Sequence, residues 1–298
     1  GFSPNLQSYV THQVFDQKAM LQPITKGHSL LASTDPEAEL DRLLLLTMQP
    51  PVGPVHVELT AVLAGKKITV TDHRPQTTHV QNEIKPNQRV NSLIAGAKRP
   101  VIIIGLEARD TVVAQKIVEL VERLRCPALV TYKAKGVIAD SHVSNMGIFT
   151  GGKVEQTCVS KSDLIILIGL DPVELILKPW PYNIPVLDIA LIRHKPHYTL
   201  ATETLYGALA PSLDLLQSHA SPSIWTTKEL VAIKNDINTR MQFVGRRELN
   251  PQSIVQMAQG AARSRPRITV DAGAHMISAT AFSQASEPFD LLISNGLA

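Results

Sequence analysis

The sequence predicts an α/β protein with a doubly wound parallel sheet, in which helices cover both faces of parallel strands. Short apolar runs alternate with amphipathic helical segments along most of the chain, which is typical of βαβ units. Two of these runs, residues 101–104 and 164–168, are entirely aliphatic, which predicts strands buried on both faces. A chain of 298 residues with 44% hydrophobic and 18% charged residues is long enough for about two domains.

The first segment is predicted to end an α/β unit. Asp35 and Pro36 supply a cap and a first-turn proline for a helix over residues 37–48, whose apolar positions recur at helical spacing. A proline-rich break precedes a short alternating strand over residues 55–59. Beyond residue 63 the sequence is polar without periodicity, which indicates an interdomain connection at residues 65–85.

Residues 86–245 are predicted to form a complete sheet domain, because helices and strands alternate through them. The expected helices are 88–97, 112–124 and 153–160, and the expected strands are 101–104, 128–131, 164–168 and 186–189. An amphipathic segment at 226–243 leads to a helix capped by Asn250 and to a strand at 268–271. The last part, 246–298, is too short to close a domain of its own.

Three predicted strand ends are candidate binding sites, since ligands bind beyond the carboxyl ends of parallel strands. Gly105 lacks G-x-G-x-x-G spacing, so a tight turn is favoured there over a dinucleotide site. Asp171 and Glu174 either bind a ribose hydroxyl or start a turn. Residues 271–275, Asp-Ala-Gly-Ala-His, lead into a helix and leave N–H groups for a phosphate, unless they form only a close turn.

Composition excludes several classes of protein. A net charge of +3, with basic clusters that lack interleaved aromatic residues, argues against a nucleic-acid partner. The apolar runs are far shorter than the ~20 residues of a membrane helix, so no membrane association is expected. Two cysteines without paired spacing predict a reduced, cytoplasmic chain.

Histidine chemistry is not expected from the spacing. His12, His28, His56 and His73 fall on different kinds of segment without an H-E-x-x-H pattern, so no metal ligand is predicted. His194 and His197, three residues apart and flanked by Arg193 and Lys195, are expected to form a solvated basic loop rather than a ligand pair.

The order of several motifs resembles the thiamine-diphosphate-dependent enzymes of the acetolactate synthase and 2-oxo-acid decarboxylase superfamily. The resemblance covers nearly the whole chain. The segments that carry it are 11–17, 23–26, 51–57, 98–105, 133–136, 162–169, 270–275 and 294–297.

The resemblance implies a domain assignment. Residues 1–64 would be the C-terminal part of a pyrimidine-binding domain, 65–85 a linker, 86–245 a Rossmann-like central domain and 246–298 the truncated start of a diphosphate-binding domain. Partial α/β domains would thus flank the central one. The family's catalytic glutamate would precede Gly1, and its Gly-Asp-Gly metal motif would follow Ala298, so an internal fragment is expected.

The resemblance also implies site residues and cofactors. Gln13 would face the substrate and cofactor as the candidate catalytic residue. Gly273, Ala274, His275, Gly296 and Leu297 would lie against the cofactor. The full-length parent would use thiamine diphosphate and Mg²⁺, whereas residues 170–175 depart from the flavin-containing pattern and argue against FAD.

The implied activity is decarboxylation of a 2-oxo acid, with or without transfer of the acyl-anion equivalent to an acceptor. This lyase or transferase would be inactive as the isolated chain. Family active sites form between subunits, so the full-length form would be a homodimer or homotetramer. Two alternatives stay open: a non-catalytic nucleotide-binding module of the ADP, CoA or FAD type, and a degenerate structural remnant.

Overall fold

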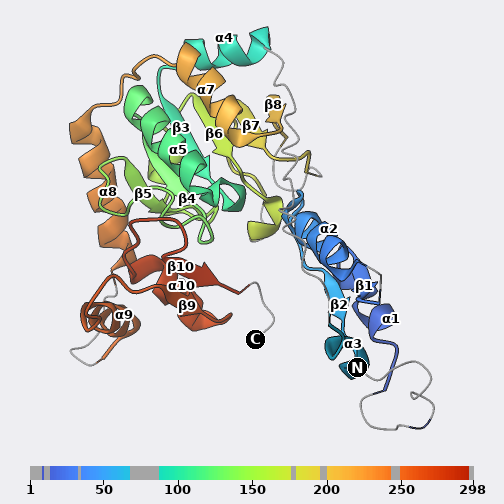
Figure 1. Ribbon diagram of the computed structural model, residues 1–298. Coiled ribbons are helices and arrows are strands. Elements are labelled where there is room, and N and C mark those ends of the chain that lie inside the picture. The colour runs from blue at the N-terminus through green and yellow to red at the C-terminus, as the bar shows by residue number, and fades with distance from the viewer. Residues whose placement is uncertain are drawn as a thin grey trace. The chain divides into compact units, whose positions relative to one another are not determined.

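The computed structural model describes residues 9, 14–32, 35–67, 87–175, 179–194, 200–242 and 249–294. The chain divides into two compact units, Gly1–Val80 and Gln81–Ala298, which are described separately (Figure 1). The connection expected at 65–85 lies almost wholly outside the described residues. The four-part domain assignment stays a prediction.

The first unit contains a two-stranded parallel sheet and short helices. Strand β1 (His28–Leu30) pairs with β2 (His56–Glu58), and α2 (Pro36–Met48) packs against β1. The helix begins as predicted, because the Asp35 side chain accepts a hydrogen bond from Ala38 N at 2.9 Å. The described part of this unit also contains α1 (Gln17–Leu21), η2 (Gln22–Ile24) and α3 (Ala61–Ala64).

The second unit is built on a six-stranded parallel sheet, which confirms the predicted fold class. Its strand order is β5-β4-β3-β6-β7-β8, so the chain winds outward in both directions from the centre. The strands are β3 (Pro100–Ile104), β4 (Ala128–Val130), β5 (Asn145–Ile148), β6 (Leu164–Ile168), β7 (Val186–Ala190) and β8 (Glu203–Tyr206). Strands β3 and β6 are completely buried, as their aliphatic sequences predict.

Helices flank this sheet (Figure 1). Helix α5 (Thr111–Leu124) packs against α7 (Leu209–His219), which also contacts α4 (Gln88–Gly96), while α8 (Thr227–Met241) packs beside β5. Cys126 and Cys158 are free thiols buried in the core. None of the described helices is both long and apolar enough to cross a lipid bilayer.

One predicted helix is much shorter than expected, and several described elements had no prediction. The segment 153–160 forms only a single turn, α6 (Gln156–Val159), because the buried Glu155 carboxylate accepts N–H bonds from Thr150 and Gly152 and holds the preceding residues as a loop. Strands β5 and β8 lie at the sheet edges, where polar and glycine residues weaken the strand pattern. Helix α7 was not predicted either.

The C-terminal part forms a second small parallel sheet. Strand β9 (Ile268–Val270) pairs with β10 (Leu291–Ile293), and α9 (Pro251–Gly260) packs against α10 (Ala274–Phe282).

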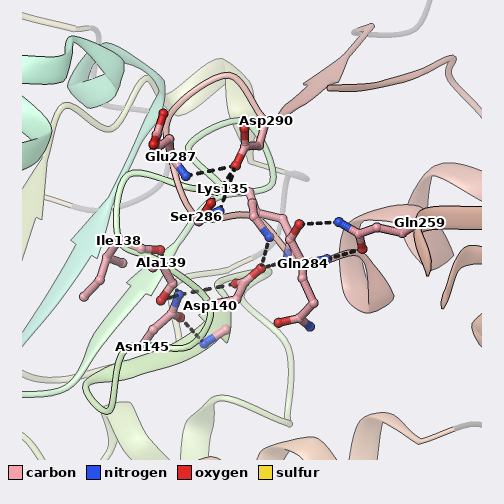
Figure 2. A network of polar contacts seen from close by, with 12 residues as sticks. Lys135, Ile138, Ala139, Asp140, Asn145, Gln259, Gln284, Ser286, Glu287 and Asp290 are labelled. Carbon is pink, nitrogen blue, oxygen red and sulfur yellow. Dashed lines mark hydrogen bonds and ion pairs between the residues drawn. The ribbon is translucent and has the colours of Figure 1, made fainter. Parts of the chain in front are cut away.

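Hydrogen bonds connect this C-terminal part to the loops of the central sheet (Figure 2). Asp140 N donates to Ala285 O at 2.9 Å, and Ala285 N donates to the Asp140 carboxylate at 2.8 Å. Gln259 exchanges two hydrogen bonds with the backbone of Gln284, at 2.6 and 2.8 Å. The ends of β9 and β10 are thereby placed relative to the central sheet within this unit.

Candidate functional site

A cavity of about 590 Å³ lies at the carboxyl ends of β9 and β10. Residues that follow β3 and β4 in the central sheet complete its wall. The lining residues are Arg109, Lys133, Thr269, Val270, Asp271, Leu292, Ile293 and Ser294. Its position agrees with the rule that ligands bind beyond the carboxyl ends of parallel strands.

Two positively charged side chains that are partly buried, Arg109 and Lys133, line this cavity. Arg109 ends the short turn η3 (Leu106–Arg109), and its guanidinium carbon lies 4.8 Å from the centre of the Phe289 ring. The Arg109 Nε is buried and has no hydrogen-bond partner in the part of the chain that the structure describes. Burial lowers the pKa of both Arg109 and Lys133, and nearby Glu174 opposes the shift in each. The wall is therefore suited to an anion, because a bound anion would compensate the desolvated charge.

Helix α10 begins shortly after this part of the wall in the sequence. Asp271 lines the cavity, and its carboxylate accepts a hydrogen bond from Ala272 N at 2.8 Å. Gly273 follows with φ of 140°, and no side chain caps the helix that begins at Ala274. The first N–H groups of a helix lack intrahelical partners, so they are available to an anion.

The predicted cofactor-contacting residues fall into two groups. Gly273, Ala274 and His275 are exposed at the start of α10, and Ala272 separates them from the cavity residue Asp271. Gln13, Gly296 and Leu297 lie outside the described residues. The roles of all six stay predictions.

Arg109, Lys133 and Ser294 line the cavity but had no predicted role there. Their positions in the sequence could have indicated such a role, because Arg109, Lys133 and Ser294 follow closely after strands β3, β4 and β10, respectively.

The Glu174 side chain accepts hydrogen bonds from residues that follow three strands of the central sheet. Its Oε1 accepts hydrogen bonds from Leu106 N at 2.7 Å and Asp171 N at 3.1 Å, and its Oε2 accepts one from the Thr131 hydroxyl at 2.5 Å. Burial raises the pKa of Glu174 to about 7, although these hydrogen bonds act in the opposite direction. Asp171 and Glu174 form a reciprocal capping box around a short turn, so the structure shows the turn interpretation of this pair.

Gly105 and Gly169 let two strand-end turns pack directly against each other. A Cβ on Gly105 would lie 2.4 Å from Leu170 Cα, and Gly169 has φ of 62°. Glu107 N donates a hydrogen bond to Gly169 O at 2.9 Å. The tight-turn interpretation of Gly105 is therefore confirmed.

The prediction of a solvated basic loop is wrong for His194, whereas His197 lies outside the described residues. Its Nε2 lies 2.8 Å from Glu107 Oε1, its Nδ1 lies 3.9 Å from Asp171 Oδ1, and its side chain is only 15% exposed. The other oxygen of Glu107 accepts a hydrogen bond from Leu191 N at 2.7 Å. The segment after β7 therefore folds against the turn after β3, so His194 has acidic neighbours despite the basic residues beside it in the sequence.

Comparisons with known proteins identify the class of this domain. Residues 87–196 match the family described as "Thiamine pyrophosphate enzyme, central domain". The second unit thus contains a central domain of the thiamine pyrophosphate enzyme type.

Whole-chain comparisons point to one group of enzymes. The chain is 23% identical to an acetolactate synthase of Bacillus subtilis, over 96% of this chain and 53% of that protein. It is also 23% identical to a catabolic acetolactate synthase of Raoultella terrigena, over 96% of this chain and 54% of that protein. A probable acetolactate synthase large subunit of Methanococcus aeolicus is 28% identical over 53% of this chain and 28% of that protein.

The chain is a distant homologue of the acetolactate synthases over most of its length, which confirms the resemblance drawn from the motifs. It spans about half the length of the relatives that it matches almost from end to end.

Proposed function

We propose that this chain is part of a thiamine-diphosphate- and Mg²⁺-dependent enzyme that decarboxylates a 2-oxo acid, with or without transfer of the acyl-anion equivalent to an acceptor. The observation that carries the proposal is the cationic cavity at the ends of β9 and β10, whose lining residue Asp271 shortly precedes the uncapped start of α10 in the sequence. The distant homology to acetolactate synthases supports it. The chain alone is proposed to be inactive, and the assembly of the whole enzyme to be a cytoplasmic homodimer or homotetramer.

The cavity fits the diphosphate part of the cofactor. Arg109 and Lys133 supply positive charge, and the Arg109 Nε lacks a partner among the described residues. The metal is a different case, because the described lining contains a single carboxylate, Asp271, and a Mg²⁺ site takes more oxygen ligands than that. These residues alone therefore do not form a Mg²⁺ site.

The cofactor and the residues that would bind it have different roles. Bound thiamine diphosphate supplies the electron sink that 2-oxo-acid decarboxylation requires. Arg109 and Lys133 would bind the diphosphate oxygens, and the first N–H groups of α10 would donate to them. Partial burial strengthens both interactions, since charges attract more strongly where water is excluded.

Calorimetric titration with thiamine diphosphate tests the binding step on this chain. We expect Arg109→Gln and Lys133→Gln each to weaken binding about ten-fold or more, because each removes a charge-assisted hydrogen bond. Lys153→Gln is the matched control, since Lys153 is exposed and outside the cavity, and it should bind like the unmodified chain. Equal affinity of all four proteins would contradict the assignment of the cavity.

Activity is tested on the product of the gene together with its flanking coding sequence. Release of carbon dioxide from pyruvate or a related 2-oxo acid, dependent on thiamine diphosphate and Mg²⁺, is the expected result. Thermal stabilisation by ADP but not by thiamine diphosphate would instead favour the nucleotide-binding module.

A further inference from the structure

Three potential metal ligands share one face of the small sheet in the first unit. In the parallel pair of β1 and β2, His28 lies opposite His56, and Leu30 lies opposite Glu58. Paired residues of neighbouring strands point to the same face, and so do residues two apart on one strand. His28, His56 and Glu58 therefore point to one face.

The side chains meet at short distances. His28 Nε2 lies 3.1 Å from Glu58 Oε1, and the His28 and His56 rings have centroids 4.9 Å apart. One ligand atom from each of the three residues lies within 4.8 Å of the others. Ligand atoms around tetrahedral zinc are about 3.3 Å apart, which follows from bonds of roughly 2.0–2.1 Å. Small side-chain rotations would thus bring the three atoms to one ion.

A second observation indicates that this cluster is more than a hydrogen-bonded pair. The Nδ1 of His56 is buried and has no hydrogen-bond partner in the described part of the chain. A buried polar atom without a partner is costly unless a ligand or water satisfies it. The cluster remains open to small solutes, because the His28 and Glu58 side chains are 18% and 30% exposed.

We propose that His28, His56 and Glu58 bind a divalent transition-metal ion, with Zn²⁺ as the preferred ion. Two imidazoles and one carboxylate form a ligand set suited to zinc, and three protein ligands leave a fourth position for water. Mg²⁺ prefers oxygen ligands, so this site would be distinct from the Mg²⁺ requirement proposed for the enzyme.

The sequence could not reveal this site from ligand spacing. His28 and His56 belong to different strands and become neighbours only through the pairing of β1 with β2. The prediction of no metal site rested on spacing within single segments, and the cluster gives a structural reason to revise it.

Binding of Co²⁺ and Zn²⁺ to the tag-free chain, in excess Mg²⁺, tests the proposal. Visible absorption reports Co²⁺ coordination, and calorimetry gives the affinity and stoichiometry for Zn²⁺. We expect His28→Gln, His56→Gln and Glu58→Gln each to weaken binding at this site at least about ten-fold, the scale on which even indirect contacts to a metal ligand matter. His219→Gln, which changes an exposed histidine on α7, should leave binding unchanged.

A measurement on the unmodified chain tests the proposal even if a variant misfolds. X-ray absorption at the zinc edge of the unmodified chain should show two imidazoles and oxygen ligands at about 2.0–2.1 Å. The proposal is overturned if the unmodified chain takes up no zinc, or if spectrum and affinity persist in all three variants. Neither result bears on the cofactor cavity, whose residues belong to the other unit.

Discussion

Lys135 Nζ lies 2.7 Å from Asp140 Oδ2, and both side chains are almost fully buried, with 4% and 11% exposure. The same carboxylate oxygen accepts a hydrogen bond from Ala285 N at 2.8 Å (Figure 2). One carboxylate thus compensates a buried cation and holds the C-terminal segment to the loop after β4.

Replacing Asp140 by alanine should therefore be strongly destabilising. We expect Asp140→Ala to lower the free energy of unfolding by about 3–5 kcal/mol, because it leaves the Lys135 ammonium buried without its partner. Urea denaturation measures the change. Asp214→Ala is the control, since Asp214 is 56% exposed in its pair with Lys116, and its loss should cost less than about 1 kcal/mol. Equal costs would contradict a special role for the buried pair.

The carboxyl group of Glu174 should make stability depend on pH. Its pKa is raised from 4.5 to about 7 in the folded state, so the folded chain binds more protons than the unfolded chain between these values. The stabilisation is present below about pH 4.5 and is lost as pH rises through about 7. The full loss is on the order of 3 kcal/mol.

Glu174→Gln isolates this contribution. The amide oxygen can still accept from Leu106 N and Asp171 N, and the NH₂ group can donate to the Thr131 hydroxyl, as a protonated carboxyl would. We expect the variant to become increasingly more stable than the unmodified chain between pH 5 and pH 8. A stability difference that stays constant over this range would show that Glu174 does not titrate there. Asp188, whose pKa is raised to about 6 by burial, is present in both proteins and cancels in the comparison.

A side chain at Gly136 is expected to be destabilising. A Cβ built on it would lie 2.0 Å from Glu287 O, and its φ is 95°. Gly147 has a similar φ of 91° but nothing within 4 Å of such a Cβ. Gly147→Ala therefore measures only the free-energy cost of a side chain in this backbone conformation. We expect Gly136→Ala to cost roughly 1–3 kcal/mol more than Gly147→Ala in the free energy of unfolding, because only the former forces the two loops apart. Thermal unfolding of the two variants side by side measures the difference.

The N-terminus of α8 offers a test of helix capping. The Thr226 hydroxyl accepts a hydrogen bond from Glu229 N at 3.2 Å, and the Glu229 carboxylate accepts one from Thr226 N at 2.9 Å. Thr226→Ala should lower stability by about 1 kcal/mol. Thr239→Ala makes the same change within the exposed part of the helix and should be neutral or slightly stabilising, since alanine is the better helix former. A larger loss at position 239 than at 226 would contradict the capping role.

The sequence predicted the central sheet well because its signals were local. Strands such as β3 and β6 are continuous aliphatic runs, and their burial on both faces follows directly from that composition. The edge strand β5 contains Gly147 and the polar Asn145, so its strand conformation depends on pairing with β4 rather than on its own sequence.

The candidate site was harder to predict because it is assembled by tertiary contacts. Asp271 was identified from a local pattern, a small-residue turn between a strand and a helix. Arg109 and Lys133 reach the same cavity from two other strands, and no spacing in the sequence relates them to Asp271. His194 was misjudged for the same reason, since its acidic partner Glu107 follows a different strand.

The pairing of β3 with β6 at the centre of the six-stranded sheet has a consequence for how this unit folds. Pro100 pairs with Leu164 across this seam, whereas other neighbouring strands join residues closer in the chain, such as Ile102 with Ala128 and Leu187 with Glu203. Each half of the sheet can therefore form from nearby segments, and the seam carries the largest loop-closure entropy. Until it closes, each half exposes an aliphatic strand edge, β3 or β6. Self-association of half-formed sheets through these edges therefore competes with correct folding.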